Sequence, residues 1–265
     1  MFRSFKQRAL EPEVMDDFTD GGHELREALG QIRRLNRIFA APGPVLYGVR
    51  KLWKDAGKPR RFTILDIGSG SGDVNKALLR WAEEEGLELS IILSDITEEA
   101  CEEARLLYRG EPRIRVRRSD VFDLPEASAD IITASQFLHH FPEEELPKVV
   151  GHMLAASRLG VVISDLHRHW MPWLAVSVMV RLISANRFVK TDGPLSVAKG
   201  FRGRDWRKLR AALEAEAAAG AGTGTEIDTG TSMGAETKDF VYSWRPMFRY
   251  AAVIRRKNSR TNPVE

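Results

Sequence analysis

The sequence predicts an α/β fold in which a mainly parallel sheet carries helices on both faces. From Arg61 onward, short apolar segments alternate with segments whose apolar residues recur at helical spacing. The first apolar segment, Phe62 to Ile67, leads directly into a series of glycines. Strands and helices in regular alternation are typical of βαβ units, whose strands lie parallel and bind ligands at their carboxyl ends. The predicted fold class is therefore Rossmann-like.

The apolar runs place the individual strands. Five strands are expected in the parallel part, at 62–67, 89–93, 114–116, 129–134 and 161–164. In the third strand Ile114 and Val116 alternate with arginines, which indicates a position near the edge of the sheet. The end of the chain, residues 240–253, also has strand character and is expected to close the sheet as an antiparallel pair. Among the helices, Thr97 can cap the second, and Pro147 marks the start of another.

The segments outside this alternation divide the chain. Residues 1–60 are expected to form a helical N-terminal cap or lid, with Leu25, Leu29 and Ile32 at helical spacing. Residues 61–257 form the predicted sheet domain, which carries a lid insert at 166–203, and residues 258–265 form a tail. The stretch 217–234, rich in Gly, Thr and Ala, is expected to be a mobile loop.

The amino-acid composition limits the class of protein and the kinds of partner that it can bind. The 265 residues are 43% hydrophobic and 29% charged, which is typical of a globular protein. Lys plus Arg number 40 against 37 Asp plus Glu, so no polyanion-binding surface is indicated, and no nucleic-acid partner is expected. Basic clusters at 113–118 and 255–257 fit a solvated strand edge and tail better than a nucleic-acid site. The single cysteine, Cys101, excludes a disulfide framework and is consistent with the cytoplasm. The longest apolar stretch, 170–183, is too short to span a bilayer.

Residues 64–74, ILDIGSGSGDV, are the strongest motif. A strand, a glycine loop and a helix N-terminus together let a ligand approach the main chain and its unpaired N–H groups. A dinucleotide site needs G-x-G-x-x-G, whereas the glycines here are spaced G-x-G-x-G. The carboxylate of Asp73 would also face the negatively charged pyrophosphate of a dinucleotide, which is unfavourable. A P-loop needs Gly-Lys followed by Ser or Thr, which Gly72-Asp73-Val74 lacks. A purely structural glycine turn is the remaining alternative.

The segment resembles motif I of the class I S-adenosylmethionine-dependent methyltransferases, whose cofactor carries an ammonium group and no phosphate. The LHH sequence at 138–140 is similar to that of ubiquinone and menaquinone C-methyltransferases. The resemblance covers residues 61–165 and implies S-adenosylmethionine as cofactor. It implies that an acid at position 95 binds the ribose hydroxyls, that Ile96 lies against adenine, and that residues 120–121 also contact the adenine; for Asp120 a turn cap is equally open. The implied cofactor-binding residues are Asp66, Gly68, Ser69, Gly70, Gly72, Asp95, Ile96, Asp120, Val121 and Gln136.

Histidines gather at the ends of the fourth and fifth predicted strands, at 139, 140, 167 and 169. Histidine is the usual base near neutral pH. His140 is the first candidate for a catalytic base and His167 the second, while Asp165 is a candidate to orient an imidazole or bind the acceptor. An apolar acceptor pocket is expected from Met15, Phe18, Trp170, Trp173, Met179 and Phe188, each of which could equally be core.

These features predict a methyltransferase that acts on a small acceptor, namely a hydroxylated aromatic, polyketide or quinone-like compound, at oxygen or carbon. A methyltransferase of RNA or protein and a non-catalytic cofactor-binding module are the alternatives. Many enzymes that methylate amino groups of nucleic acids carry an N/D-P-P-Y/F tetrapeptide after the fourth strand. Residues 135–138 read SQFL instead, which lowers support for an RNA acceptor. No metal is expected. Weak contact with a membrane surface through residues 170–173 is a further expectation.

Overall fold

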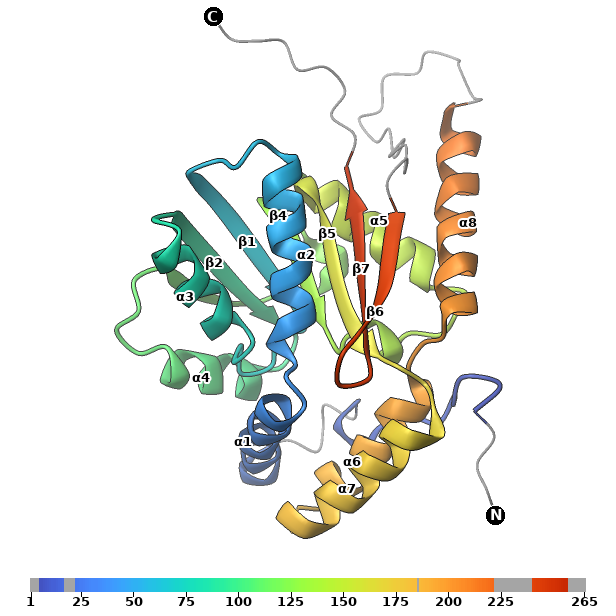
Figure 1. The fold of residues 1–265 in the computed structure, drawn as a ribbon. Coiled ribbons are helices and arrows are strands. Elements are labelled where there is room, and N and C mark those ends of the chain that lie inside the picture. Colours follow the sequence, from blue (N-terminus) through green and yellow to red (C-terminus); the bar gives the residue numbers. More distant parts are fainter. Residues whose placement is uncertain (1–4, 17–21, 185, 222–239, 257–265) are drawn as a thin grey trace, which may run out of the picture.

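The computed structural model describes residues 5–16, 22–184, 186–221 and 240–256. Within them, a seven-stranded sheet has the order β3-β2-β1-β4-β5-β7-β6 (Figure 1). The strands are β1 Arg61–Ile67, β2 Glu88–Asp95, β3 Ile114–Arg118, β4 Ala129–Ser135, β5 Ser157–Leu166, β6 Phe240–Arg245 and β7 Arg249–Arg255. The first five are parallel, and β7 runs antiparallel to both β5 and β6.

The predicted fold class is confirmed. Every predicted strand forms within a few residues of its expected bounds, and β3 lies at the edge of the sheet, as its arginine alternation indicated. The antiparallel pair at the end of the chain also forms, although β7 rather than β6 lies next to β5. The strand order changes direction between β1 and β4, so a ligand is expected at the carboxyl ends of these two strands.

Helices cover both faces of the sheet (Figure 1). One face packs against α2 (Pro42–Asp55), α3 (Asn75–Glu84) and α4 (Glu98–Leu107), and the other against α5 (Leu146–Ala156) and α8 (Gly203–Ala221). Pro147 lies in the first turn of α5, where its missing N–H is harmless, as predicted. Two short 3-10 helices, η2 (Val121–Asp123) and η3 (Leu138–His140), follow β3 and β4.

Helix α2 lies on the sheet rather than at the ligand end. A Cβ atom added at Gly48 would stand 2.3 Å from Cγ1 of Val162, which shows how closely the helix approaches β5. Val45, Val49 and Leu52 are buried in the same core as β1 and β2. Apolar helical spacing in residues 1–60 could not distinguish this position from a lid. Within residues 1–60, the part that reaches the strand ends is therefore the part that precedes α2.

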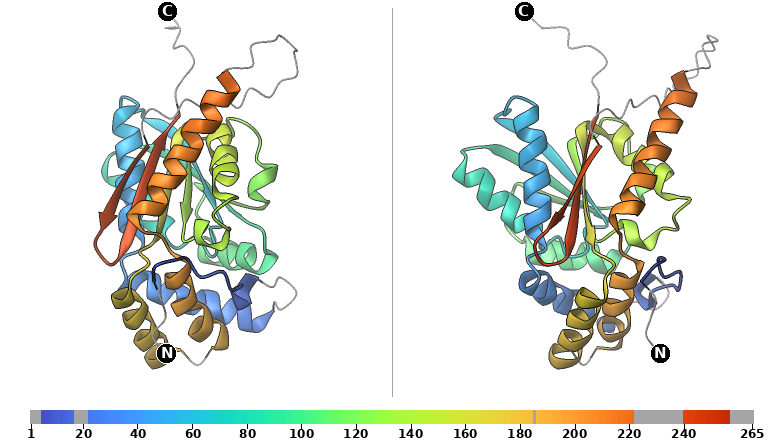
Figure 2. Two further views of the ribbon diagram at one scale, coloured as in Figure 1. Left: turned by 90° about the vertical axis from the view of Figure 1, so that its right-hand side faces the viewer. Right: turned by 45° about the vertical axis from the view of Figure 1, so that its right-hand side comes forward.

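A separate layer lies across the carboxyl ends of the strands (Figure 2). It consists of η1 (Val14–Asp16), α1 (His23–Ile38), α6 (Trp170–Ile183) and α7 (Arg187–Lys199). These helices share a hydrophobic cluster of their own, which includes Leu25, Ala28, Val180, Phe188 and Val189 and no strand residue. We call η1, α1, α6 and α7 the cap.

The expected loop at 217–234 is wrong at its start. Residues 217–221 continue α8, since alanine is the strongest helix former and this part of the stretch is rich in it. The rest of that stretch and the predicted tail at 258–265 lie outside the described residues.

Candidate active site

A cavity of about 570 Å³ lies between the carboxyl ends of the strands and the cap. The glycine loop after β1 and the ends of β2 and β4 form one side, and apolar residues of α1, α6 and α7 form the other. Nine of the ten residues that the sequence assigned to the cofactor line it: Asp66, Gly68, Ser69, Gly70, Asp95, Ile96, Asp120, Val121 and Gln136. The tenth, Gly72, does not.

Two glycines of the loop have different surroundings. Gly70 has a φ of +54°, and the nearest atom to an added Cβ would be Cδ2 of Leu29 at 3.7 Å, so its main chain faces open space. Gly72 has a φ of +73°, but an added Cβ would stand 2.5 Å from Cδ1 of Leu93. Its carbonyl accepts a hydrogen bond of 2.7 Å from the Tyr108 hydroxyl. Gly70 thus leaves room for a ligand, whereas Gly72 lets the loop pack onto β2.

Asp95 joins the glycine loop to the end of β2. Its Oδ2 accepts from the main-chain N–H of Gly70 at 2.8 Å, and its Oδ1 accepts from the N–H and hydroxyl of Thr97 at 3.1 and 3.0 Å. Thr97 is the N-cap residue of α4, but its hydroxyl bonds Asp95 and makes no capping bond, so the predicted side-chain cap is wrong. Asp120 lines the cavity and also caps η2 by accepting from the Phe122 N–H, so both of its proposed roles are compatible with the structure.

The interior of the loop is acidic. Asp66 accepts from Thr133 and Asn75 at 2.7 and 2.6 Å, and burial raises its pKa to about 6 against these two hydrogen bonds. Burial also raises the pKa of Asp73, whose carboxylate accepts long bonds of 3.3 and 3.4 Å from Asn36. Desolvated carboxylates favour a cation beside them. The open cradle at Gly70 and this acidic wall fit a ligand that carries an ammonium and a sulfonium charge.

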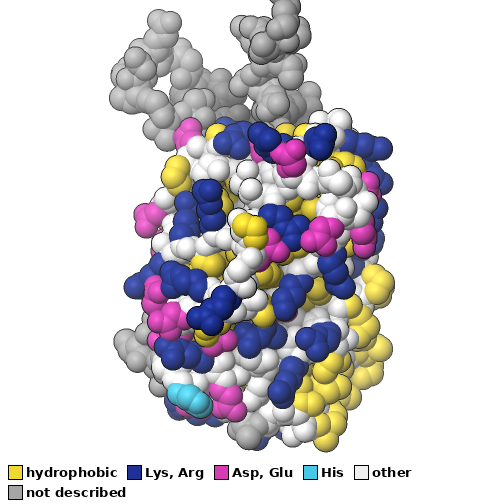
Figure 3. All heavy atoms as spheres, turned by 90° about the vertical axis from the view of Figure 1, so that its left-hand side faces the viewer, with side chains coloured by type: hydrophobic (Ala, Val, Ile, Leu, Met, Phe, Trp, Pro, Cys, Tyr) yellow, Lys and Arg dark blue, Asp and Glu magenta, His cyan; other side chains and the backbone are white. Residues whose placement is uncertain are grey.

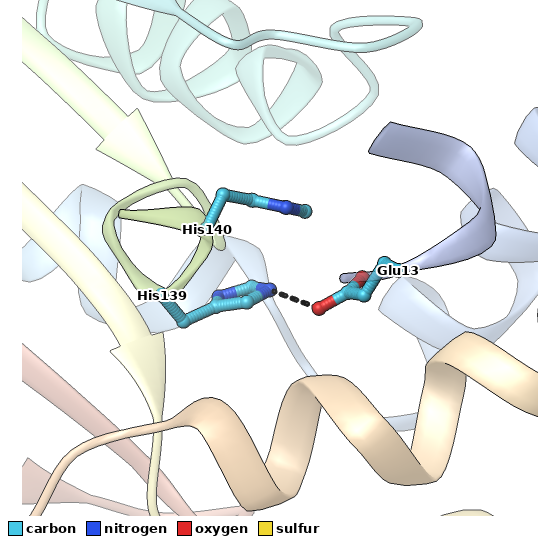
Figure 4. A group of neighbouring side chains, drawn as sticks. All are labelled: Glu13, His139 and His140. Carbon is cyan, nitrogen blue, oxygen red and sulfur yellow. Dashed lines mark ion pairs between the residues drawn. The ribbon is translucent and has the colours of Figure 1, made fainter. Parts of the chain in front are cut away.

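A second group of titratable side chains lies where η3 meets the cap (Figure 4). His139 is 2% exposed; its Nδ1 lies 2.8 Å from Oδ1 of Asp165, and its Nε2 lies 3.6 Å from Oε1 of Glu13. Asp165 is fully buried, and the His139 charge and hydrogen bond outweigh desolvation, so the pKa of Asp165 is lowered. Asp165 therefore orients an imidazole, one of the two roles for which it was a candidate, and that imidazole belongs to His139.

His140 stacks on His139, with 4.3 Å between ring centroids, and lines the cavity. Its Nδ1 lies 2.7 Å from Oδ1 of Asp16. Burial lowers the pKa of His140, but the hydrogen bond to Asp16 and the charges of Glu13 and Asp16 outweigh it, so the net pKa is raised. With Nδ1 bonded to a carboxylate, Nε2 is the nitrogen left to accept a proton.

Glu13, His139 and His140 also offer three atoms that could bind a metal ion, all within 4.8 Å of one another. The ammonium group of Lys199 already lies 3.4 Å from Oε1 of Glu13 and 3.4 Å from Oδ2 of Asp16. A metal ion would have to displace this cation, because two positive charges would otherwise share one carboxylate. The arrangement is therefore better suited to proton transfer and charge balance.

His167 lies outside the cavity. Leu166, the last residue of β5, lines the cavity, and successive side chains along an extended chain point to opposite sides. The His167 ring instead meets Tyr250 edge-on at 5.3 Å and stacks on His169 at 5.5 Å. Burial is the main cause that lowers its pKa to about 4. His167 is consequently withdrawn as a candidate base.

Known proteins resemble the central part of the chain. Residues 64–160 match the protein family described as a methyltransferase domain. The ubiquinone/menaquinone biosynthesis C-methyltransferase of Rickettsia bellii (strain OSU 85-389) is 29% identical over 106 residues, which are 37% of this chain and 43% of that protein. The protein of the same name from Rickettsia prowazekii (strain Madrid E) is 40% identical over 62 residues, 22% of this chain and 25% of that protein. The chain spans less than half the length of these curated relatives.

Two solved structures share the fold. A SAM dependent methyltransferase from Aquifex aeolicus superimposes with a TM-score of 0.52 at 14% identity, over 88% of this chain and 98% of that one. Human N-acetylserotonin methyltransferase in complex with SAM gives a TM-score of 0.54 at 16% identity, over 94% of this chain and 63% of that one. Residues 64–160 therefore resemble a methyltransferase domain, and the chain has the fold of these S-adenosylmethionine-dependent methyltransferases.

The sequence analysis predicted the residues on the glycine-loop side of the cavity more completely than those on its apolar side. Of the residues expected to line an acceptor pocket, Met15 lines the cavity and Phe188 is buried in the cap cluster. Trp170, Trp173 and Met179 do not line the cavity, and Phe18 lies outside the described residues. The sequence analysis gave no role to Glu13, Asp16, Asp192, Lys199 or Arg249. Glu13 and Asp16 lie more than 120 residues from His139 and His140, so no local motif joins them. A cluster of carboxylates near the N-terminus, PEVMDD at 12–17, was the one visible sign.

Proposed function

We propose that the protein transfers the methyl group of S-adenosylmethionine to a small, largely apolar acceptor that carries a hydroxyl or an activated carbon. The acceptor classes that fit are hydroxylated aromatic, polyketide and quinone-like compounds. The observation that carries the proposal is a cavity whose acidic, glycine-lined side is continuous with an apolar side, with His140 on its wall.

The residues of the loop suit the cofactor. Gly70 leaves the space for its methionyl part, and Asp66 and Asp73 supply negative charge for its ammonium and sulfonium groups. Asp95, whose carboxylate already bonds a loop N–H, is placed to accept from ribose hydroxyls. Ile96, 38% exposed at the cavity, would cover the adenine ring. When bound, the cofactor would supply an electrophilic methyl group on a sulfonium sulfur; the sulfur keeps the electron pair of the broken C–S bond and leaves as the neutral thioether of S-adenosylhomocysteine.

We propose His140 as the base. Asp16 accepts a hydrogen bond from the Nδ1–H group, so Nε2 can take the proton that the acceptor oxygen or carbon loses as its bond to the methyl group forms. The raised pKa of His140 makes Nε2 a stronger proton acceptor than a free imidazole. Asp165 and Glu13 hold His139, on which the His140 ring stacks, and this contact fixes the plane of the base.

We also propose that the cap acts as a lid over the cavity. Asp192 of α7 accepts from the N–H groups of Val14 and Met15 at 2.9 Å each, and Asn186 donates to the carbonyl of Glu24 at 3.0 Å. With these bonds and its own hydrophobic cluster, the cap can move as a unit, and its closure would exclude water from methyl transfer. Hydrogen exchange should gain protection in residues 22–38 and 170–199 when S-adenosylhomocysteine and an acceptor bind. Unchanged exchange in both segments would make the cap a fixed layer.

A small acceptor is favoured over RNA or protein because the cap covers the apolar side of the cavity.

The outer face of α6 is apolar and exposed to solvent. Its exposed residues are Trp170, Met171, Leu174, Val178 and Leu182. They form an apolar patch beside a largely charged surface (Figure 3). None of the helices in the described part of the chain combines the length and the apolar composition of a transmembrane span. We propose that this patch makes weak contact with a membrane surface from the cytoplasm, which suits a lipid-soluble acceptor. The fraction of protein that sediments with phosphatidylcholine vesicles should be lower for the double variant Leu174→Ser/Leu182→Ser than for the intact protein.

The decisive experiment measures S-adenosylhomocysteine formation with a panel of phenols, quinols and β-diketones. Calorimetry first establishes whether S-adenosylmethionine binds. Turnover that falls by roughly 10²–10⁴-fold in His140→Ala, with unchanged cofactor affinity, is the expected result. His167→Ala is the matched control, since that histidine lies outside the cavity, and it should keep full turnover. Equal losses in both variants, or no cofactor binding by the intact protein, would contradict the proposal.

A further inference from the structure

The cavity wall contains a buried cation that the function proposed above does not use. Arg249, the first residue of β7, is 2% exposed and lines the cavity. Its Nη1 is buried without a hydrogen-bond partner among the described residues, and its Nε reaches only the carbonyl of Phe39, at 3.5 Å. Within the same residues, Arg249 forms no ion pair with a carboxylate. Burial of an uncompensated guanidinium is costly, and burial lowers the pKa of Arg249 to about 10.

The turn before Arg249 is held in an unusual conformation. Met247 and Phe248, the second and third residues of the three-residue loop between β6 and β7, have φ values of +61° and +59°. A tight hairpin of this kind normally carries Gly or Asn at these positions, because a larger side chain is strained there. The carbonyl of Phe248 accepts from the N–H of His167 at 2.9 Å, and Met247, Phe248 and Arg249 all face the cavity. The turn therefore brings the start of β7, with Arg249, to the cavity wall.

The carboxylates nearest to Arg249 are not its partners. Asp165 is one of the two carboxylates that raise the pKa of Arg249, but its oxygens already accept from His139 and from the N–H of Leu166. Asp73 is the other, and it bonds only Asn36 among the described side chains. The cavity wall thus holds a desolvated cation, Arg249, and a desolvated anion, Asp73, neither of which forms an ion pair among the described residues. A ligand group with both charges, the zwitterion of an α-amino acid, would compensate both.

We propose that Arg249 binds a carboxylate inside the cavity, and that this carboxylate is the one on the methionyl part of S-adenosylmethionine, with Asp73 facing the neighbouring ammonium group. This inference rests on the proposed function and adds a residue that the glycine motif does not contain. Guanidinium is suited to the role because its planar fork pairs with both oxygens of a carboxylate. Asp66, Asp73 and Asp95 alone would repel that carboxylate, so a cation is required near them.

The test compares S-adenosylmethionine with decarboxylated S-adenosylmethionine, which keeps the ammonium and sulfonium groups and lacks only the carboxylate. Calorimetry on the intact protein should give tighter binding of the first ligand. In Arg249→Met, affinity for S-adenosylmethionine should fall about 10- to 100-fold, while affinity for the decarboxylated ligand stays the same. Arg249→Lys should lie between, because lysine keeps the charge without the fork. Arg255→Met, at the other end of β7 and paired with Asp55, is the matched control and should change neither affinity.

The remaining outcomes are distinct. Equal losses for both ligands in Arg249→Met, with a lower Tm, would make Arg249 a structural residue and overturn the proposal. Unchanged preference between the ligands, with loss of benzoate binding, would assign Arg249 to a carboxylate on the acceptor and overturn the cofactor assignment. Absence of binding of either ligand by the intact protein would instead contradict the proposed function. A Tm of the unliganded Arg249→Met variant equal to or above that of the intact protein would support a cation kept for binding rather than for stability.

Discussion

The two glycines with different surroundings, Gly70 and Gly72, allow the cofactor assignment to be separated from the stability of the loop. Alanine at either position must adopt a left-handed φ, of +54° or +73°, which costs about 1–2 kcal/mol. At Gly70 the new methyl group meets nothing closer than 3.7 Å, so no further cost arises in the unliganded protein. At Gly72 it would stand 2.5 Å from Leu93, and overpacking adds about 1–3 kcal/mol. Gly72→Ala is therefore the less stable variant.

Binding should show the opposite order. In Gly70→Ala the methyl group occupies space that we assign to the methionyl part, so the affinity for S-adenosylhomocysteine should fall at least tenfold, and Gly70→Val should abolish it. Gly72→Ala should bind within a few-fold of the intact protein at temperatures where it is folded. Thermal unfolding and calorimetry on the same preparations measure both quantities. If Gly70→Ala binds normally, or if the two variants lose affinity in proportion to lost stability, the cofactor does not lie against Gly70.

Three other predictions follow from the titrating groups and from Asp95. Because the pKa of Asp66 is raised to about 6, cofactor affinity should increase with pH up to about 6, where Asp66 ionises, and then level off; Asp66→Asn should remove that dependence in calorimetry. Turnover should fall as pH drops through the raised pKa of His140, above 6.5, and Asp16→Asn should move this limb of the rate profile to lower pH; an unmoved limb would contradict the pairing. Asp95→Ala should weaken S-adenosylhomocysteine binding at least tenfold by calorimetry, through lost ribose bonds and a loosened loop, and unchanged affinity would exclude Asp95 from the site.

The sheet could be predicted because its determinants are local. The apolar runs of β1 and β4 and the arginine alternation of β3 each specify a strand within its own few residues. Helix α2 could not be placed in the same way. Its apolar face, with Val45 and Val49, has the spacing of any amphipathic helix, and only the close approach of Gly48 to Val162 shows that it belongs to the sheet. Helical periodicity identifies a buried face and does not identify its partner.

The two sides of the cavity also differ in whether they are determined by local sequence or by tertiary contacts. The cofactor side is carried by one loop and by residues at successive strand ends, so a short motif contains most of its chemistry. The acceptor side is assembled by tertiary contacts: Asp16 reaches His140, Glu13 reaches His139, and Lys199 neutralises both acids. As the proposed base is oriented by a carboxylate of η1, a conformation with the N-terminal segment undocked would hold the cofactor and lack an oriented base. Closure of the cap and readiness to accept a proton would then be one event, and this coupling would keep proton transfer from preceding exclusion of water.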